Sequence, residues 1–574
     1  MMPHFTNHQV AERFNHIADL LEIKGENRFK VLAYRRAAEN ILNLGRDINA
    51  VYQAGELGEV PGIGEAITDK ITELLSTGKM SFWEKLSAEV PPSLTAVLAV
   101  PGVGPKTARL LWQELHVTTV AELKAAAEAG QLSRLPGLGA KTEANILAGI
   151  AALSRRQTDR VRLDVAWRTA LDIIAPLRAL PEALRLEPAG SLRRFAPTIG
   201  DLDILVATRQ PEPIMAVFKA LPGVEEVLGS GPTKTSVRFE NGLQADLRCL
   251  EPEHWGTALQ YFTGSKAHNV RIRELAQKQG LSLNEYALTR SDGGQIHCPE
   301  EAEVYAALGL PFIPAVLRED RGEVEAALAG HLPELVQLED IKGDLHCHST
   351  WSDGKGSIEE MARAALSRGY AYLVIADHSQ ALGIANGLTP ERLRQQRQEI
   401  AAVQGRVPGI RLLQGTEVEI KADGTLDFAD EVLASLDLVV ASVHTGLQQD
   451  RATLTARVIN AMRNPYVRAI GHPTGRLLGK REGGDFDLEV LLQTAAETGT
   501  MMEVNASPER LDLDSIYVKR AVELGVILTI NCDAHHPDDF ASLSFGLATA
   551  QRGWANAKHI GNTYALEQLL ALKK

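Results

Sequence analysis

Two aspartates two residues apart open an apolar run in the segment G-D-L-D-I-L-V. The branched apolar residues 204–206 predict a β-strand. Because the side chains of a strand alternate between its faces, Asp201 and Asp203 share one face. Adjacent carboxylates repel each other unless a cation lies between them, and hard oxygen ligands suit Mg²⁺ or Mn²⁺. The pair therefore predicts a divalent-metal site.

A turn suited to phosphate precedes this pair. Gly190 and Ser191 predict a tight turn with free backbone N–H groups, and Arg193 and Arg194 add positive charge. Backbone N–H groups and arginines together can hold a polyphosphate. Metal-binding carboxylates beside such a turn indicate phosphoryl transfer with two metal ions.

A third carboxylate comes from a predicted β-hairpin over residues 235–250, in which Asn241-Gly242 forms the turn. Asp246 stands on the second strand, where it could face the first pair. A DxD pair alone is common in solvated loops. The glycine-serine turn, two arginines, DxD and a strand-borne aspartate in this order favour the catalytic interpretation over the solvated one.

After residue 341 the pattern changes to strands that alternate with helices, and a second chemistry begins. Apolar runs of the strand type end repeatedly in histidine, aspartate or glutamate. The carboxyl ends of the strands of a (β/α) barrel meet on one face, so these residues predict a multi-metal site there. The alternative, scattered surface histidines, does not account for the repeated placement at strand ends. The candidate ligands are His346, His348, Asp353, His378, Glu417, His444, His472, Asp533 and His535.

Three turns of the form P-G-x-G each lead into a predicted amphipathic helix in the amino-terminal part of the chain. Bare backbone N–H groups at the start of a helix bind phosphate. One such turn can be a plain helix connection, but three in one chain favour binding to the DNA backbone without sequence preference. The candidate contacts are Gly62, Gly64, Gly102, Gly104, Gly137 and Gly139, with Lys106 and Lys141 on the helices that follow.

With these motifs the chain resembles the family X DNA polymerases. The glycine-serine turn, the DxD pair, Asp246 and the run Y-F-T-G-S at residues 261–265 carry the match. The resemblance implies that Asp201, Asp203 and Asp246 bind the catalytic metals, and that Asp246 acts as the base on the primer 3′-hydroxyl. It also implies a set of nucleotide-binding residues: Gly190, Ser191, Arg194, Tyr261, Phe262, Gly264, Asn269 and Arg273.

The amino-terminal helices resemble the small 5′-phosphate-binding domain of the same family. By that resemblance Lys70 takes the position of the lysine that forms a Schiff base with an abasic sugar, a catalytic role, and Lys30 and Tyr34 belong to the phosphate pocket. Ala66 stands where animal members carry another lysine, and a lysine on a helix is most often solvated. The resemblance therefore favours 5′-phosphate binding over lyase chemistry.

The carboxyl-terminal half resembles the PHP (polymerase and histidinol phosphatase) domain, a distorted seven-stranded barrel with a trinuclear metal site. All nine candidate ligands fall on its motif positions, and Glu417 takes the position that bridges two metals. Because no motif position is lost, the resemblance implies an active hydrolase that holds up to three ions of Mn²⁺, Zn²⁺ or both.

At 574 residues the chain is expected to hold several domains. The predicted fold combines an all-α helix-hairpin-helix region, an α+β nucleotidyltransferase palm and a (β/α)7-like PHP barrel. The predicted divisions are a helical DNA-binding domain with the first helix-hairpin-helix at 1–88, a helix-hairpin-helix subdomain at 89–158, the palm and nucleotide-closing subdomain at 159–319, a linker at 320–340 and the PHP domain at 341–574.

Composition limits the setting of the protein. A net charge of −13 argues against coating nucleic acid by bulk charge, although it leaves room for local phosphate contacts. No apolar run reaches the ~20 residues that span a membrane, and the amino-terminal segment lacks the apolar core of a signal peptide. Four scattered cysteines without a pairing pattern predict a reducing, cytoplasmic setting.

These observations predict a family X DNA polymerase that fills short gaps in DNA repair with Mg²⁺ or Mn²⁺. The PHP half is expected to add a Mn²⁺-dependent 3′–5′ exonuclease or 3′-end processing activity, with abasic-site cleavage as a further option. The predicted partners are gapped or nicked duplex, primer-template DNA and deoxynucleoside triphosphates; the chain is expected to be a monomer that binds no membrane.

Two other functions stay open at this stage. A phosphoesterase for small phosphate monoesters would use the PHP half, but the three DNA-binding turns argue against it. A DNA-end-binding scaffold would use those turns, but the intact carboxylates of both predicted sites disfavour it.

Overall fold

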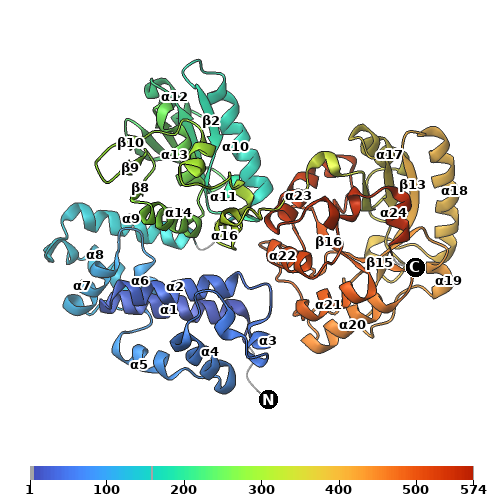
Figure 1. Cartoon of the computed structure of the whole chain (residues 1–574), viewed down its shortest axis with the longest axis horizontal. Coiled ribbons are helices and arrows are strands. Elements are labelled where there is room, and N and C mark those ends of the chain that lie inside the picture. Colours follow the sequence, from blue (N-terminus) through green and yellow to red (C-terminus); the bar gives the residue numbers. More distant parts are fainter. Residues whose placement is uncertain (1–4, 157–159, 573–574) are drawn as a thin grey trace. The chain divides into compact units, whose positions relative to one another are not determined.

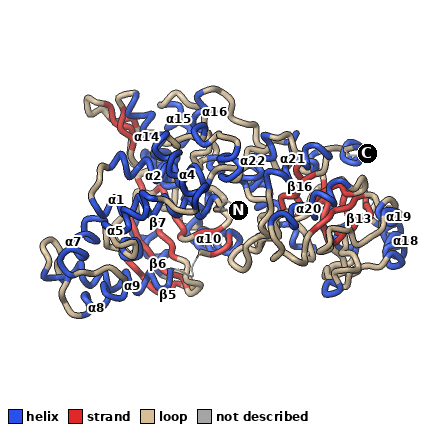
Figure 2. Tube along the Cα trace, turned by 90° about the horizontal axis from the view of Figure 1, so that it is seen from below, coloured by secondary structure: helices blue, strands red, loops and turns tan. Residues whose placement is uncertain are grey.

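The computed structural model describes residues 5–156 and 160–572. The chain divides into two compact units, Met1–Asp159 and Arg160–Lys574. The first unit is helical, whereas the second combines a mixed sheet with a parallel barrel. In Figure 2 helices are blue and strands red, and the label β13 (Arg411–Glu419) marks strands of the barrel.

The described part of the first unit contains nine α-helices, together with 3₁₀ turns at Leu57–Glu59 and Leu132–Arg134. The α-helices are α1 Asn7–Lys24, α2 Arg28–Leu42, α3 Ile48–Gln53, α4 Glu65–Thr77, α5 Ser81–Glu89, α6 Leu94–Leu98, α7 Pro105–Leu115, α8 Val120–Glu128 and α9 Ala140–Arg156. Helix α1 shows why the sequence folds this way. Thr6 and Gln9 form a capping box at its start, apolar residues at spacings of three and four face the core, and Gly25 ends it in the left-handed conformation (φ 83°). The predicted all-α region is confirmed.

The second unit begins with a five-stranded sheet in the order β2-β4-β7-β6-β5. The strands are β2 Arg185–Pro188, β4 Asp201–Ala207, β5 Val224–Ser230, β6 Lys234–Phe239 and β7 Gln244–Leu250. Strands β4 and β7 run parallel, and the predicted hairpin is formed by β6 and β7. Two further strands, β1 Val161–Arg162 and β3 Thr198–Ile199, pair with each other in a separate antiparallel sheet.

Helices cover both faces of this sheet. Leu202, Ile204 and Val206 of β4 join the core formed with α10 Leu163–Arg178 and α12 Pro211–Lys219. Leu205 and Ala207 point to the other face, where they pack with α13 Trp255–Thr263. Because the side chains of β4 alternate, the two aspartates at its start lie on the face that α13 covers.

A smaller subdomain follows α13. Its elements are α14 Lys266–Lys278, β8 Leu281–Leu283, β9 Leu288–Arg290, β10 Gln295–Ile296, α15 Glu301–Ala307 and α16 Glu323–Leu328. The segment at 320–340, which the sequence predicted to be a linker, holds the short α16 and a 3₁₀ turn at Leu338–Asp340. Val324, Ala327 and Leu335 of this segment are buried in the core of the subdomain, so it is packed rather than extended.

Seven parallel strands, in sequence order, form the carboxyl-terminal barrel. They are β11 Gly343–Cys347, β12 Tyr372–Ile375, β13 Arg411–Glu419, β14 Leu438–Ser442, β15 Val467–Ile470, β16 Met501–Asn505 and β17 Leu528–Asn531. A parallel bridge between Cys347 and Ala534 brings the first and last strands together, so the barrel is nearly closed.

Helices surround these strands (Figure 1). They are α17 Ile358–Ser367, α18 Pro390–Arg406, α19 Asp430–Leu433, α20 Arg451–Arg463, α21 Leu488–Thr498, α22 Ser515–Glu523, α23 Leu543–Arg552 and α24 Leu566–Ala571. Within the barrel, Leu345, Val374, Leu413 and Val440 belong to an apolar cluster, which leaves the carboxyl ends of the strands for polar residues.

Two further findings bear on the setting of the protein. No helix within residues 5–156 and 160–572 is long and apolar enough to cross a membrane. Cys249, Cys298, Cys347 and Cys532 are buried and free.

Candidate active sites

The three aspartates of the sheet converge on its α13 face. Strands β4 and β7 pair so that Asp203 lies directly opposite Asp246, and Asp201 stands two residues before Asp203 on the same face. The pairing explains how a strand 43 residues downstream of Asp203 supplies the third carboxylate: parallel neighbours place their residues side by side whatever their separation in sequence.

The carboxylates of this cluster repel one another when no cation is bound. Burial, and then the neighbouring charges of Asp201 and Asp246, raise the pKa of Asp203 to about 7. Asp246 behaves differently: although burial opposes it, hydrogen bonds from Lys234 and Gln244 hold its pKa below the usual range. Lys234, which the sequence did not point to, lies with its Nζ 2.6 Å from Asp246 Oδ2. Carboxylate oxygens that gather in this way fit divalent cations.

The predicted phosphate turn lies against the aspartates. Gly190 begins the short helix α11 Gly190–Arg193 with φ +60°. A Cβ atom at Gly190 would come within 2.6 Å of Asp203 Oδ2. Glycine is therefore required here, because only a bare backbone can approach the carboxylate this closely and adopt this φ.

Two arginines connect this turn to the Y-F-T-G-S segment. The guanidinium of Arg193 donates to Thr263 Oγ1 at 2.7 Å and, through both Nη atoms, to the carboxylate of Glu301. Arg194 donates through Nη1 to Thr263 O and through Nε to Glu319 Oε1 at 3.1 Å. The turn and the segment at 261–265 are thus held as one piece.

The remaining nucleotide-binding candidates differ in what they contact. Phe262 lines a cavity of about 250 Å³ together with Lys234, and the guanidinium of Arg248 lies 4.5 Å from its ring centre. The buried amide of Asn269 donates to Tyr261 O at 2.7 Å and accepts from Gln260 Nε2 at 2.8 Å. Asn269 therefore holds the backbone of the segment.

Two further candidates lie beside these. Arg273 Nε donates to Asn269 O at 3.2 Å. Gly264 follows α13 with φ +66°, and a Cβ atom there would lie 3.3 Å from Arg194 Nη1. Arg273 thus adjoins Asn269, and Gly264 adjoins the guanidinium of Arg194.

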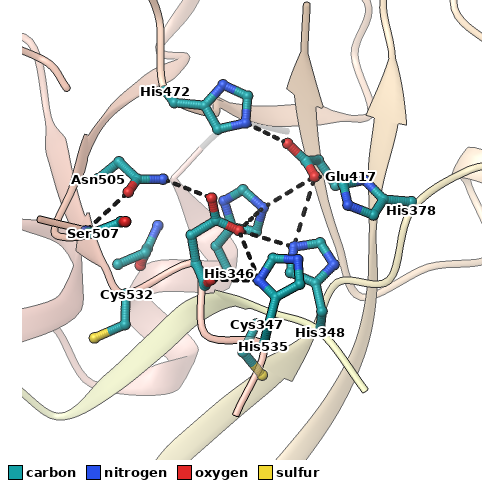
Figure 3. Close-up of polar contacts among 12 residues, drawn as sticks. His346, Cys347, His348, His378, Glu417, His472, Asn505, Ser507, Cys532 and His535 are labelled. Carbon is teal, nitrogen blue, oxygen red and sulfur yellow. Dashed lines mark hydrogen bonds and ion pairs between the residues drawn. The ribbon is translucent and has the colours of Figure 1, made fainter. Parts of the chain in front are cut away.

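All nine candidate ligands of the barrel gather at the carboxyl ends of its strands. His346 and Glu417 lie within β11 and β13, and the others follow the ends of their strands. In Figure 3 the rings of His346, His348, His378 and His472 are directed towards Glu417. Three overlapping groups could each hold an ion: His348, Asp353, His378 and His535; His346, His348 and Asp533; and His378, Glu417 and His444.

His472 completes the cluster. Its Nε2 atom lies 2.8 Å from Glu417 Oε1, while His378 Nδ1 lies 2.8 Å from Glu417 Oε2. A single carboxylate that faces different imidazoles with its two oxygens has the geometry expected of a bridging ligand.

The chemistry of the donor set fits bound metal. Both oxygens of Glu417, together with His346 Nε2 and His348 Nδ1, are buried and make no hydrogen bond in the described chain. Buried polar atoms without partners cost free energy. Imidazole nitrogens and carboxylates left in this state are the ligands that Zn²⁺, Mn²⁺ and Fe²⁺ take.

A layer of carboxylates orients these imidazoles. Glu503 Oε1 accepts from His346 Nδ1 at 2.8 Å, and Glu419 Oε2 accepts from His444 Nδ1 at 2.7 Å. A hydrogen bond at Nδ1 leaves the lone pair of Nε2 for the metal. Although burial opposes it, Glu503 and Glu417 hold the pKa of His346 well above the usual range when no ion is bound.

The structure adds one cation that the sequence did not single out. Arg510 lines the metal-site cavity of about 340 Å³, its Nε lies 3.6 Å from Asp533 Oδ2, and its buried Nη1 has no hydrogen-bond partner in the described chain. Arg476 donates to Asp514 Oδ2 at 2.9 Å and to the backbone oxygen of Arg510 at 2.9 Å. Arg476 thus supports the segment that carries Arg510.

The three P-G-x-G turns share one geometry. Gly62, Gly102 and Gly137 have φ of 73°, 89° and 82°. A Cβ atom at Gly64, Gly104 or Gly139 would meet nothing within 4 Å, so the backbone before α4, α7 and α9 faces open space. Lys106 and Lys141 are exposed on the helices that follow.

Lys30 and Lys70 meet on one aromatic ring. Their Nζ atoms lie 5.7 Å and 5.0 Å from the ring centre of Phe82, which stacks on Tyr34 at 5.7 Å. Lys70 also donates to Ala66 O at 2.6 Å. Two lysines from separate helices thus lie at one spot, as the predicted phosphate pocket requires.

The fold and the two sites define a polymerase-type nucleotidyltransferase joined to a metal-binding barrel of the phosphoesterase type. Family models match in the same order: a helix-hairpin-helix domain at residues 5–80, a helix-hairpin-helix tandem at 94–152, the DNA polymerase beta thumb at 258–319 and the PHP domain at 344–506. The chain belongs to the family X DNA polymerases that carry a carboxyl-terminal PHP domain.

Relatives support this assignment. The chain is 40% identical over 561 residues to the "DNA polymerase/3'-5' exonuclease PolX" of Bacillus subtilis (strain 168), with 97% of each chain covered. It is 24% identical to DNA polymerase lambda of Rattus norvegicus over 53% of this chain and 55% of that one. A "Probable phosphatase" of Thermoanaerobacter sp. (strain X514) is 31% identical, but over only 33% of this chain and 78% of that one.

Replacement of Asp203 by asparagine should stabilise the metal-free protein in a pH-dependent way. In the unfolded chain the carboxyl group has its ordinary pKa of 3.8, while in the folded protein its pKa is about 7. Ionisation of Asp203 lowers the free energy of unfolding. This loss is absent below the unfolded pKa, grows as the pH rises and is complete above pH 7. In EDTA, Asp203→Asn should raise the free energy of unfolding on the order of 2–4 kcal/mol at pH 8.

Thermal or urea unfolding at both ends of this pH range checks the prediction. The exposed Asp172→Asn on α10 is the control. Equal stabilisation by Asp203→Asn at pH 4 and pH 8 would contradict the assigned cause.

Loss of the Glu503 carboxylate should weaken metal binding at His346. Glu503→Gln keeps the shape but removes the acceptor that fixes the ring. We expect the affinity for Mn²⁺ or Zn²⁺ to fall by about 10–100-fold, as measured by calorimetry on the metal-depleted protein. Glu489→Gln, which alters a buried carboxylate paired with Arg520 on α21 and α22, should leave the affinity unchanged.

Proposed function

We propose that the chain fills short gaps in DNA by template-directed nucleotide addition and processes 3′ ends with its PHP domain. One observation carries the proposal: a single chain holds two separate clusters of metal-ligand residues with different donor chemistry. One consists of three carboxylates on parallel strands, and the other combines imidazoles with carboxylates in a barrel.

At the first cluster, Asp201, Asp203 and Asp246 are proposed to hold two ions of Mg²⁺ or Mn²⁺. Bound ions would supply the positive charge that stabilises the phosphoryl group during transfer. The turn at Gly190-Ser191 and the guanidinium of Arg194 receive the triphosphate of the incoming nucleotide. Asp246 lies opposite Asp203 and accepts the proton of the primer 3′-hydroxyl. Tyr261, Phe262, Gly264, Asn269 and Arg273 shape the nucleotide pocket.

At the second cluster, the nine barrel ligands are proposed to hold up to three ions, with Mn²⁺ preferred and Zn²⁺ as the other candidate. Bound ions would activate water and withdraw charge from a phosphodiester. Glu503 and Glu419 keep the imidazoles oriented. Arg510 offers an unpaired N–H to a phosphate oxygen of the DNA strand. Abasic-site cleavage by the same cluster is a further proposal.

The proposed substrate is a gapped or nicked duplex that presents a primer-template. The three helix-hairpin-helix turns contact phosphates and not bases, which suits a repair enzyme that acts at any sequence. The proposed binding unit is a monomer in the cytoplasm, where free buried cysteines such as Cys347 stay reduced. The domain divisions at 1–88, 89–158, 159–319, 320–340 and 341–574 are part of this proposal.

Two variants should separate the activities. With a one-nucleotide gap and Mn²⁺, the Asp201→Asn/Asp203→Asn enzyme should lose extension by at least about a hundredfold and keep 3′ degradation. His346→Ala should do the reverse. Extension and degradation are followed on an end-labelled primer with and without nucleotides.

Hydrolysis of p-nitrophenyl phosphate serves as the comparison substrate. Turnover of this monoester faster than DNA would favour a small-molecule phosphoesterase. Degradation without any extension by the wild-type enzyme would overturn the polymerase assignment.

Lys70 should contribute to the binding of a 5′-phosphate. Lys70→Ala removes one of the two ammonium groups beside Phe82, so the preference for gaps with a 5′-phosphate over gaps with a 5′-hydroxyl should shrink by about tenfold. Binding to both gaps is measured by fluorescence anisotropy, with Lys24→Ala, which loses an ion pair to Glu89, as control. Borohydride trapping on abasic DNA tests the lyase role: cross-linking undiminished in Lys70→Ala would remove Lys70 from it.

A further inference from the structure

A buried carboxylate joins the polymerase core to the barrel. Glu319 is the last residue of the predicted palm and nucleotide-closing division at 159–319, and its side chain is 17% exposed. Its Oε1 atom accepts from Arg194 Nε at 3.1 Å and from Arg552 Nη1 at 2.8 Å. Although burial opposes it, the positive charges of Arg552 and Arg194 lower the pKa of Glu319 to about 2. The group is therefore an anion held between two cations.

Arg552 belongs to the barrel half of the chain, at the end of α23. Its side chain is only 6% exposed, and the same Nη1 atom also donates to the backbone oxygen of Arg194. Arg552 thus bonds directly to the main chain of Arg194, and both arginines bond to the same oxygen of Glu319.

The contacts fix one part of the Arg194 guanidinium and leave another available. Nε is bound to Glu319 and Nη1 to Thr263 O. A guanidinium carries five N–H donors in a rigid plane, so two anchored nitrogens determine where the remaining donors point. Gly264 borders the same guanidinium, since a Cβ atom there would lie 3.3 Å from Arg194 Nη1. Arg194 itself ends the turn that begins at Gly190, the proposed triphosphate position.

Arg552 compensates the negative charge of Glu319 next to Arg194. Without it, Glu319 would keep a full negative charge beside Arg194, and that charge would oppose an incoming triphosphate and compete for the guanidinium. With Arg552 in place, Glu319 can anchor Arg194 while its charge is compensated from the other side.

We propose that Arg552 of the PHP domain is a positioning residue for nucleotide binding in the polymerase core, acting through Glu319 and the backbone of Arg194. The proposal rests on the assignment of Arg194 to the triphosphate under the proposed function. It means that the barrel is required for full affinity of the polymerase site for nucleotides, apart from any hydrolysis that the barrel performs.

The test compares steady-state nucleotide addition on a one-nucleotide gap by the full-length enzyme and four variants. Arg552→Met should raise the KM for the nucleotide by about tenfold and change kcat by less than about threefold, because the residue touches neither substrate nor metal ligands. Arg552→Lys, which keeps the charge, should restore most of the affinity. Degradation of 3′ ends by both variants should equal that of the wild type.

The matched control is Arg162→Met. Arg162 also crosses from the core to the barrel half, through Nη1 to Glu509 at 2.8 Å, but it contacts none of the nucleotide-site residues. Its KM should stay within about twofold of the wild-type value. A tenfold rise in this control would mean that any loosened contact between the two parts raises KM, and would overturn a specific role of Arg552.

The fourth variant separates failure of this inference from failure of the function on which it rests. If Arg194→Met raises KM while Arg552→Met leaves it unchanged, the positioning role is wrong and the triphosphate assignment stands. If Arg194→Met leaves KM unchanged, both are wrong.

KM does not depend on the folded fraction of a preparation, so partial misfolding leaves the test valid. Should Arg552→Met fail to fold at all, hydrogen–deuterium exchange on the wild-type enzyme decides. Addition of Mg²⁺ and the nucleotide to the gapped-DNA complex should then slow amide exchange in α23; unchanged exchange there would overturn the proposal.

Discussion

The structure depends on a simple electrostatic constraint: carboxylates cannot be buried together without positive charge. Asp203 shows the constraint directly, since burial and the neighbouring aspartates raise its pKa to about 7. Glu417 shows it in the barrel, where both of its buried oxygens face imidazoles and lack hydrogen bonds. In each place the chain keeps groups that would be costly in an apo protein, and the cost is offset when cations bind.

Parallel strands are the means by which the backbone brings such groups together. Register between β4 and β7 sets Asp203 against Asp246, and the barrel collects its candidate ligands from six of its seven strands, between His346 and His535. The apolar layer beneath these ligands, around Val374 and Val440, fixes the strands on which they stand. In the barrel, apolar side chains within the strands therefore form the core, while the carboxyl ends of the strands carry the candidate metal ligands.

This division also explains how far the sequence could be interpreted. Alternation along a strand is a local property, so the shared face of Asp201 and Asp203, the hairpin and the strand-end ligands could be predicted. Lys234, Glu503 and Arg510 could not, because each acts through a partner that only strand register or loop packing brings near. The packing of the segment at 320–340 could not be predicted for the same reason, because its few apolar residues are buried against residues of the neighbouring subdomain that are distant in sequence.

An acidic chain that handles a polyanion must place its cations with care. Two consecutive arginines of the predicted phosphate turn illustrate how. Arg193 is bound by Glu301, which also pairs with Arg318. Arg194 is bound by Glu319, which also pairs with Arg552. Each arginine is held by a buried carboxylate whose charge a second arginine compensates. Such a pair of networks keeps net charge low while it fixes the direction of two guanidinium groups, so the cost of orienting them is met during folding rather than on binding. Because one of the compensating arginines comes from the barrel, the joining of the two halves in one chain has a physical consequence for the polymerase site.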